Sequence, residues 1–322
     1  MKSIKKFALI GVGGYIAPRH LEAIKTSGNE LVAALDKNDS VGVLDSYFPS
    51  CSFFTEFERF DRHLEKMRYK GEKIDYLTIC SPNYLHDAHI RFGLRIGANI
   101  ICEKPLVLNP WNIDPLEEIE RETNKKINVI LQSRLHSSLI KLKKEIDKDK
   151  TYDVELTYIT SRGKWYSQSW KGEESKSGGI VTNIGIHFFD LLGWLWGKKT
   201  KNTIHIYRED KAAGYLELEK ARIKWFLSVD NNDLPLCFEK DIQKKFYKTG
   251  FKTYRSLKVN GEETEFSKLF TNLHTRSYKK ILKNKGFGTK DARPSIEIVS
   301  EIRKLEPIGL RGEYHSLLSK IK

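Results

Sequence analysis

The sequence has few cysteines and no long apolar run. Its four cysteines, Cys51, Cys80, Cys102 and Cys237, show no CxxC spacing, which is typical of a reduced compartment and indicates neither a disulfide framework nor a metal centre. No apolar stretch reaches the length of a membrane-spanning helix. The basic and apolar start of the chain leads directly into glycines without a cleavage site, so it is not read as a signal peptide. We therefore expect a cytoplasmic protein with no membrane partner.

Patterns for nucleic-acid recognition are also missing. The chain carries 56 Lys and Arg against 42 Asp and Glu, a net charge of +14, and such a balance suits nucleic acid, an anionic membrane or anionic small substrates. The lysines are scattered in short groups, and there is no arginine-rich arm, zinc pattern or RNA-binding signature. We therefore expect no nucleic-acid partner and favour a polyanionic small substrate.

The chain is long enough for two domains. It has 322 residues, and this length exceeds that of one ordinary domain. Of these residues, 39% are hydrophobic and 11% are aromatic. Short apolar strand patterns alternate with helical ones up to about residue 130, which predicts a doubly wound parallel sheet. We predict an α/β protein with this sheet in residues 1–133 and an α+β domain with an open, largely antiparallel sheet in residues 134–322. The later elements expected are strands within Gln243–Asn260 and helices over Ser267–Lys283 and Ser295–Lys304.

A glycine-rich loop follows the first predicted strand. The sequence GVGGYIA leads into a helical pattern whose first turn contains Pro18. Strand, glycine loop and helix are the context of a dinucleotide site, because glycines allow a tight turn and let a pyrophosphate reach the helix N-terminus. The spacing is a GxxGxxA variant with Ile16 at the usual third glycine, and an ordinary glycine-rich turn is the alternative. A Rossmann-type domain is indicated, in which the predicted cofactor contacts are Gly11, Gly13, Gly14, Tyr15 and Ile16.

An acidic residue ends the second predicted strand. Asp36 follows Glu30–Leu35 and lies 36 − 11 = 25 positions after Gly11. The dinucleotide fingerprint expects an acid about 20 residues on, where it binds the ribose hydroxyls and disfavours a 2′-phosphate. We predict that Asp36 binds the cofactor and that the cofactor is NAD. A cap for the following helix is the alternative.

Two further turns follow apolar strands. The turn Ser81-Pro82-Asn83 follows the strand Asp75–Cys80, and Glu103-Lys104-Pro105 follows the strand that begins at Asn99. Open α/β sheets bind ligands at the carboxyl ends of their strands, and Pro105 also stiffens the backbone at Lys104. A solvated Glu-Lys turn and a capping or surface histidine at His86 are the alternatives. The predicted cofactor contacts here are Ser81, Pro82, Asn83, His86, Glu103 and Lys104.

The second half contains an unusually apolar helical pattern with a polar stripe. We predict a long loop over Arg162–Gly179 and one helix over Gly178–Gly197. Asn183 and His187 are spaced i and i+4, so they share a helix face, and Asp190 follows three residues later. Buried polar groups are costly unless they are paired. The stripe is therefore either a hydrogen-bonded core or a functional site, and we favour the functional site.

Together these motifs resemble the glucose–fructose oxidoreductase/inositol dehydrogenase (Gfo/Idh/MocA) family. The GVGGYIA loop, the SPNYLH turn, the ICEKPL stretch and the GGIVTNIGIHFFDLL helix carry the resemblance in chain order. The family's most specific mark is EKP, whose lysine corresponds to Lys104. Its second mark is Asp-xxx-His on a helix, which here reads Asn183-xxx-His187, so the carboxylate is missing. The resemblance implies an NAD-dependent dehydrogenase.

Longer stretches, including GYIAPRHLEAI and WKGEESKSGGIVTNIGIHFFD, resemble the family members that act on UDP-N-acetylglucosaminuronic acid and carry the asparagine version of the second mark. This resemblance implies oxidation of the sugar C3 hydroxyl with NAD in bacterial O-antigen (lipopolysaccharide) sugar biosynthesis. It also implies reoxidation of NADH by 2-oxoglutarate and a homo-oligomer, a tetramer built on the open sheet. A dehydrogenase of another sugar or polyol and a non-catalytic NAD-binding regulator are the alternative functions.

The chemistry of the residues suggests their roles. His187 is our candidate general base, because an imidazole titrates near neutral pH. Lys104 would polarise the hydroxyl, or act as the base itself if its pKa is depressed, and Asn183 would orient the substrate. The cationic side chains predicted to bind a diphosphate and a carboxylate, with surface solvation as the alternative, are Arg134, Arg162 and Lys171.

Overall fold

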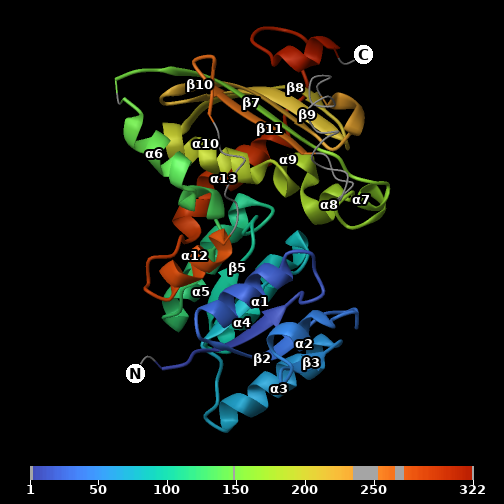
Figure 1. Ribbon diagram of the computed structural model, residues 1–322, viewed down its shortest axis with the longest axis vertical. Coiled ribbons are helices and arrows are strands. Elements are labelled where there is room, and N and C mark those ends of the chain that lie inside the picture. The colour runs from blue at the N-terminus through green and yellow to red at the C-terminus, as the bar shows by residue number, and fades with distance from the viewer. Residues whose placement is uncertain (1–2, 148, 235–252, 265–271, 321–322) are drawn as a thin grey trace. The chain divides into compact units, whose positions relative to one another are not determined.

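The computed structural model describes residues 3–147, 149–234, 253–264 and 272–320 (Figure 1). The chain forms two compact units: residues 1–135 with 270–293, and residues 136–269 with 294–322. The sequence places residues 272–293 in the second domain, whereas they pack within the first unit. Cys237, most of Gln243–Asn260 and the start of the helix expected from Ser267 lie outside the described residues.

The first unit contains a six-stranded, all-parallel sheet with the order β3-β2-β1-β4-β5-β6. This order confirms the doubly wound sheet. The chain adds strands on one side of β1 and then on the other, so the strand order reverses between β1 and β4, where such sheets bind ligands. The strands are β1 (Lys6–Ile10), β2 (Glu30–Leu35), β3 (Ser52–Phe54), β4 (Tyr76–Ile79), β5 (Asn99–Cys102) and β6 (Ile127–Val129).

Helices with one apolar face cover this sheet. They are α1 (Ala17–Thr26), α2 (Val43–Tyr47), α3 (Phe57–Tyr69), α4 (His86–Arg95), α5 (Ile113–Thr123) and α12 (Leu273–Ile281), with short 3₁₀ turns η1 (Asn83–Leu85), η2 (Pro110–Asn112) and η3 (Gln132–Leu135). The helix α12 comes late in the chain and lies beside α1 (Figure 1). Its Tyr278 and Ile281 join Leu21 and Ile24 of α1 in one buried cluster with Phe7 of β1. The late segment is therefore part of this unit's core.

The second unit contains a six-stranded sheet with the order β12-β11-β7-β10-β9-β8. Among the described strands of this sheet, only β7 and β10 pair in parallel, which confirms a largely antiparallel sheet. Asn260 and Gly261, with φ of 50° and 85°, make the turn between β11 and β12. The strands are β7 (Tyr152–Thr160), β8 (Lys199–Tyr207), β9 (Lys211–Leu218), β10 (Ala221–Ser228), β11 (Thr253–Val259) and β12 (Glu262–Glu263).

One face of this sheet packs against α10, where the Phe189 ring meets Trp225 edge-on at 5.2 Å. The opposite face includes Ile159 and Phe226, which pack with Leu318 near the end of the chain. The remaining elements are α6 (Ser137–Glu145), α7 (Trp165–Gln168), α8 (Glu174–Ser177), α9 (Gly179–Asn183), α10 (Ile186–Trp196), α13 (Thr289–Ile302), η4 (Asn231–Asp233) and η5 (Ser316–Lys320). Among the described residues, no helix has the length and apolar character needed to cross a membrane.

Two expectations for the second half are wrong. The predicted loop over Arg162–Gly179 contains the short helices α7 and α8, and the predicted helix over Gly178–Gly197 is broken after Asn183. At the break, a side chain on Gly185 would lie 2.5 Å from the Val181 carbonyl oxygen and 2.7 Å from Leu227 of β10. The close approach of the sheet therefore requires glycine, and Asn183 and His187 lie on two consecutive helices rather than one.

Candidate active site

The glycine loop joins β1 to the N-terminus of α1. Gly11 has a φ of +88°, and a side chain there would lie 2.6 Å from the carbonyl group of Cys80, so only glycine fits. No side chain among the described residues caps the first turn of α1, and the amides of Ala17 and Arg19 in that turn donate to backbone carbonyl oxygens of the loop. Tyr15 is 88% exposed at the tip of the loop. The loop thus has the tight turn between strand and helix that a dinucleotide site needs.

Asp36 is fixed at the end of β2 by backbone groups. Its Oδ2 accepts a hydrogen bond from the Gly13 amide at 2.9 Å, and its Oδ1 accepts one from the Asn38 amide at 3.0 Å. Because α2 begins only at Val43, Asp36 does not cap that helix. Its carboxylate stands next to the glycine loop, as a ligand for ribose hydroxyls must. The residues present therefore fit NAD.

His86 connects the two turns at the strand ends. The side chain is 1% exposed, with Nδ1 2.7 Å from the Pro105 carbonyl oxygen and Nε2 2.9 Å from the Ser81 carbonyl oxygen. The surface-histidine alternative is therefore wrong. Ser81 also contacts Nδ1 of His89 through its hydroxyl at 2.9 Å, and burial lowers the pKa of His89 to about 4. His89, which the sequence did not single out, supports this turn.

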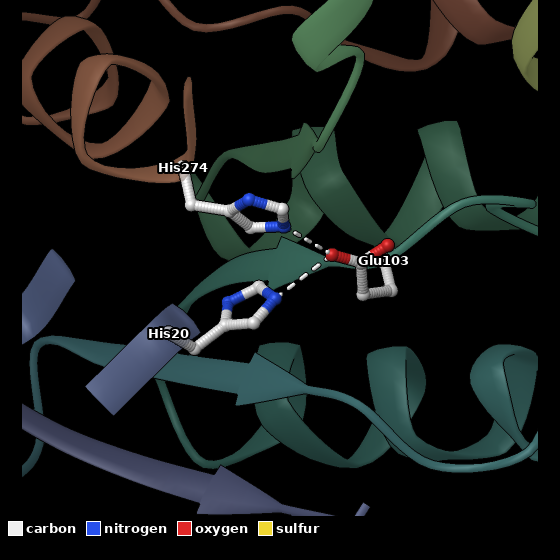
Figure 2. A group of neighbouring side chains, drawn as sticks. All are labelled: His20, Glu103 and His274. Carbon is white, nitrogen blue, oxygen red and sulfur yellow. Dashed lines mark hydrogen bonds and ion pairs between the residues drawn. The ribbon is translucent and has the colours of Figure 1, made fainter. Parts of the chain in front are cut away.

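Glu103 is a buried hydrogen-bond acceptor rather than part of a solvated turn. Its side chain is 8% exposed, and its Oε1 lies 2.8 Å from His20 Nε2 and 3.0 Å from His274 Nε2 (Figure 2). Its Oε2 accepts a hydrogen bond from the Lys104 amide at 3.2 Å. Burial raises the pKa of Glu103, but the hydrogen bonds from the two histidines outweigh it and hold the pKa well below its usual range. Glu103 is therefore an ionised acceptor that anchors the turn.

Lys104 is half-buried, whereas its neighbours Glu103 and Pro105 are buried. The peptide bond between Lys104 and Pro105 is cis. The cofactor contacts predicted near Lys104 lie in two turns of the same unit, one after β4 and one after β5. These strands are neighbours in the sheet, so the sequence was right to place the two turns at one edge.

In the second unit, Asn183 and His187 are both half-buried. Asn183 Nδ2 donates a hydrogen bond to the Tyr166 hydroxyl of α7 at 2.9 Å. Asp190, one turn after His187, is buried in α10. The predicted loop before α9 thus contributes Tyr166, a site neighbour that the helical spacing of Asn183 could not reveal.

Two of the three predicted anion-binding side chains lie close together in this unit. The Lys171 ammonium lies over the Trp170 ring at 4.6 Å from its centroid and over Trp165 at 5.5 Å. Burial, and then the nearby Arg162 guanidinium, lower the pKa of Lys171. Arg162 also acts on the pKa of Tyr166, which burial raises. The result is a cationic group set among aromatic rings.

Arg134 occupies a different environment. It is 8% exposed, and its guanidinium bonds to the Asp291 carboxylate and the Asp291 carbonyl oxygen, each at 2.9 Å. It also lies over the Phe287 ring at 5.2 Å. These contacts hold residues 287–291 against the rest of the first unit. We therefore do not assign Arg134 to the proposed substrate site.

Comparison with known proteins agrees with this architecture. A family model described as an oxidoreductase family with an NAD-binding Rossmann fold matches residues 5–131, and one for the same family's C-terminal alpha/beta domain matches residues 143–307. The chain belongs to the Gfo/Idh/MocA oxidoreductase family. The predicted family, the fold class and NAD as cofactor are thereby confirmed.

Two solved structures are similar to almost the whole chain. The WlbA (WbpB) dehydrogenase of Thermus thermophilus in complex with NAD and alpha-ketoglutarate is 49% identical, with a TM-score of 0.91, over 97% of this chain and 99% of that one. The same dehydrogenase in complex with NAD and UDP-GlcNAcA is 48% identical, with a TM-score of 0.90 and the same coverage.

More distant relatives show less. The WlbA dehydrogenase of Bordetella pertussis is 19% identical with a TM-score of 0.73 over 97% of this chain and 100% of that one, which shows the fold alone. The inositol 2-dehydrogenase of Rhizobium meliloti is 31% identical over 126 residues. That match covers 39% of this chain and 38% of the relative, so the chain spans about two fifths of the length of this curated relative.

Proposed function

We propose that this protein oxidises the C3 hydroxyl of UDP-N-acetylglucosaminuronic acid to the 3-keto sugar with NAD. The observation that carries the proposal is the similarity over 97% of the chain to a dehydrogenase solved with NAD and UDP-GlcNAcA. Lys104, Asn183 and His187 of the sequence motifs are all present. The activity is that of an NAD-dependent sugar-nucleotide dehydrogenase.

The reaction divides between the cofactor and the protein. NAD, which the glycine loop and Asp36 would hold, would supply the acceptor for the hydride from C3. We assign His187 as the base that takes the hydroxyl proton while the C–O bond becomes a carbonyl. Lys104 donates a hydrogen bond to the reacting oxygen and stabilises its developing negative charge. Asn183, oriented by Tyr166 at 2.9 Å, holds the sugar.

The substrate carries a diphosphate and a carboxylate, which require cationic partners. We assign Arg162 and Lys171 to these groups. Their proximity is supported by the effect of Arg162 on the pKa of Lys171. The Trp165 and Trp170 rings hold the Lys171 ammonium, so less side-chain entropy is lost when an anion binds.

We further propose that 2-oxoglutarate is the second substrate, because the similar Thermus dehydrogenase was solved with alpha-ketoglutarate. It would accept the hydride at C2 together with a proton and leave as 2-hydroxyglutarate, which regenerates NAD. A tetramer built on the open sheet of the second unit, a cytoplasmic location and a role in O-antigen sugar biosynthesis complete the proposal.

The test follows the nicotinamide absorbance of the purified protein after addition of UDP-N-acetylglucosaminuronic acid, with and without 2-oxoglutarate. We expect a rise that stops at one equivalent of bound cofactor, and continued turnover only when 2-oxoglutarate is present. A steady rise with added free NAD, independent of 2-oxoglutarate, would keep the sugar and reject the recycling. No change in protein that contains NAD would reject the substrate and favour another polyol or a regulator.

A further inference from the structure

Buried histidines form hydrogen bonds with the residues on both sides of Lys104, which are Glu103 and Pro105. On one side, the Glu103 carboxylate accepts hydrogen bonds from His20 of α1 and His274 of α12 (Figure 2). On the other side, the Pro105 carbonyl oxygen lies 2.7 Å from Nδ1 of His86. All three imidazoles are at most 4% exposed. The backbone that carries the Lys104 amine is thus fixed from both directions.

The hydrogen bonds at Glu103 form one consistent chain. When Nε2 of each imidazole carries its proton, both rings donate to Oε1 of the ionised carboxylate. The Nδ1 atom of His20 then accepts from the Tyr278 hydroxyl at 2.8 Å, and that hydroxyl accepts from the Thr78 hydroxyl at 3.0 Å. This chain of hydrogen bonds therefore links α1, α12 and β4 to the turn after β5.

A metal ion is the competing interpretation of this cluster. The possible ligand atoms of His20, Glu103 and His274 lie within 4.8 Å of one another. However, the oxygen-to-nitrogen distances of 2.8 and 3.0 Å are those of hydrogen bonds. One carboxylate with two imidazole donors and the Lys104 amide is also already satisfied, so the geometry favours hydrogen bonding without a metal.

We propose that His274, together with His20 and His86, is a positioning residue for Lys104. The proposal rests on the role of Lys104 in the proposed function. Hydrogen bonding to a transition state loses much of its value when the donor is displaced by about 1 Å, and a buried, hydrogen-bonded turn prevents such displacement. His274 is separated from Glu103 by 171 positions, so the late segment of the chain completes the site of the first unit.

The experiment compares three variants of the full-length protein with bound NAD. His274→Leu removes the donor to Glu103, whereas His274→Gln keeps an amide N–H at a similar distance from the backbone. Ser277→Ala is the control on the same helix, since its hydroxyl bonds only to the Leu273 carbonyl among the contacts seen. The measurements are kcat and KM with UDP-N-acetylglucosaminuronic acid, and the acetylation rate of Lys104 followed by mass spectrometry of its peptide.

We expect His274→Leu to lower kcat by about 10- to 100-fold with KM changed less than about threefold, and to alter the acetylation rate of Lys104. His274→Gln should recover most of kcat, and Ser277→Ala should match the wild type. Equal loss in the leucine and glutamine variants would mean packing rather than hydrogen bonding and would overturn the proposal, as would an unaltered acetylation rate and kcat in His274→Leu.

Two further outcomes separate this proposal from others. Stoichiometric metal in the wild type, absent from His274→Leu and required for kcat, would replace the hydrogen-bonded cluster with a metal site. If the wild type contains NAD but does not react with the sugar nucleotide, the proposed function fails, and the acetylation rate of Lys104 alone decides the positioning role.

Discussion

The two units hold their candidate site residues by different physical means. In the first unit, Lys104 follows a buried carboxylate whose three hydrogen-bond donors come from α1, α12 and the turn itself. In the second unit, Lys171 and Asn183 are half-buried and lie near α7 and α9, helices of four and five residues, with aromatic rings as neighbours. A buried network suits a group whose position decides the chemistry, and a partly exposed aromatic surface suits recognition of an anionic ligand.

The largest effects should come from the two residues assigned to the chemistry. Lys104→Met should lower kcat by about 10³-fold, because it removes the donor to the reacting oxygen. His187→Asn should lower kcat by about 10²- to 10⁴-fold and remove the acid limb of its pH profile, because a base must be unprotonated to accept the proton. Both are measured as the single-turnover rate of reduction of bound NAD.

The two variants also decide which residue is the base. Complete loss of hydride transfer in Lys104→Met, together with a near-normal pH dependence in His187→Asn, would reverse the assignment and make Lys104 the base.

A smaller effect should distinguish two arginines that the sequence treats alike. Arg162→Met should raise KM for the UDP sugar about tenfold or more, because it removes a charge-assisted contact of about 1.5–3 kcal/mol. Arg134→Met should leave KM within about twofold but lower the melting temperature by several degrees, because it leaves Asp291 without its buried partner. Steady-state kinetics and thermal unfolding measure the two. An unchanged melting temperature with a raised KM in Arg134→Met would return that residue to the substrate site.

The smallest effect concerns acid stability in the second unit. His315 is buried against Thr157, and burial, followed by Lys258 and Lys224, lowers its pKa to about 3. Its pKa in the unfolded chain is about 6.5, so between these values the unfolded state binds the extra proton. The free energy of unfolding should therefore fall as the pH falls from about 6.5 toward 3. His315→Gln should make this decline shallower by about one proton in urea titrations at several pH values; an identical slope would contradict the origin assigned to it.

Local patterns in the sequence predict the strands well. The expected bounds of Glu30–Leu35 coincide with β2, and the strand expected from Asn99 begins where β5 begins, because apolar runs and alternation depend on neighbours along the chain. The glycine loop, Asp36 and the EKP turn follow from the same logic, since each is placed by the end of a strand.

Contacts between distant segments explain what the sequence pattern missed. His274 reaches Glu103 across 171 positions, and Arg134 meets Asp291 across 157. The break between α9 and α10 depends on how closely Gly185 approaches Leu227 of β10, which no helical period encodes. The residues to which we assign the chemistry therefore follow from their motifs, whereas the long-range contacts of Glu103 and Arg134 do not follow from any local pattern.

The most direct test of the proposed reaction follows the hydrogen on C3. The protein is incubated with UDP-N-acetylglucosaminuronic acid carrying deuterium at C3 and with unlabelled 2-oxoglutarate, and the products are analysed by mass spectrometry. The account predicts a 3-keto sugar without deuterium and 2-hydroxyglutarate with one deuterium at C2. Deuterium retained in the sugar, or 2-hydroxyglutarate formed without label, would contradict it.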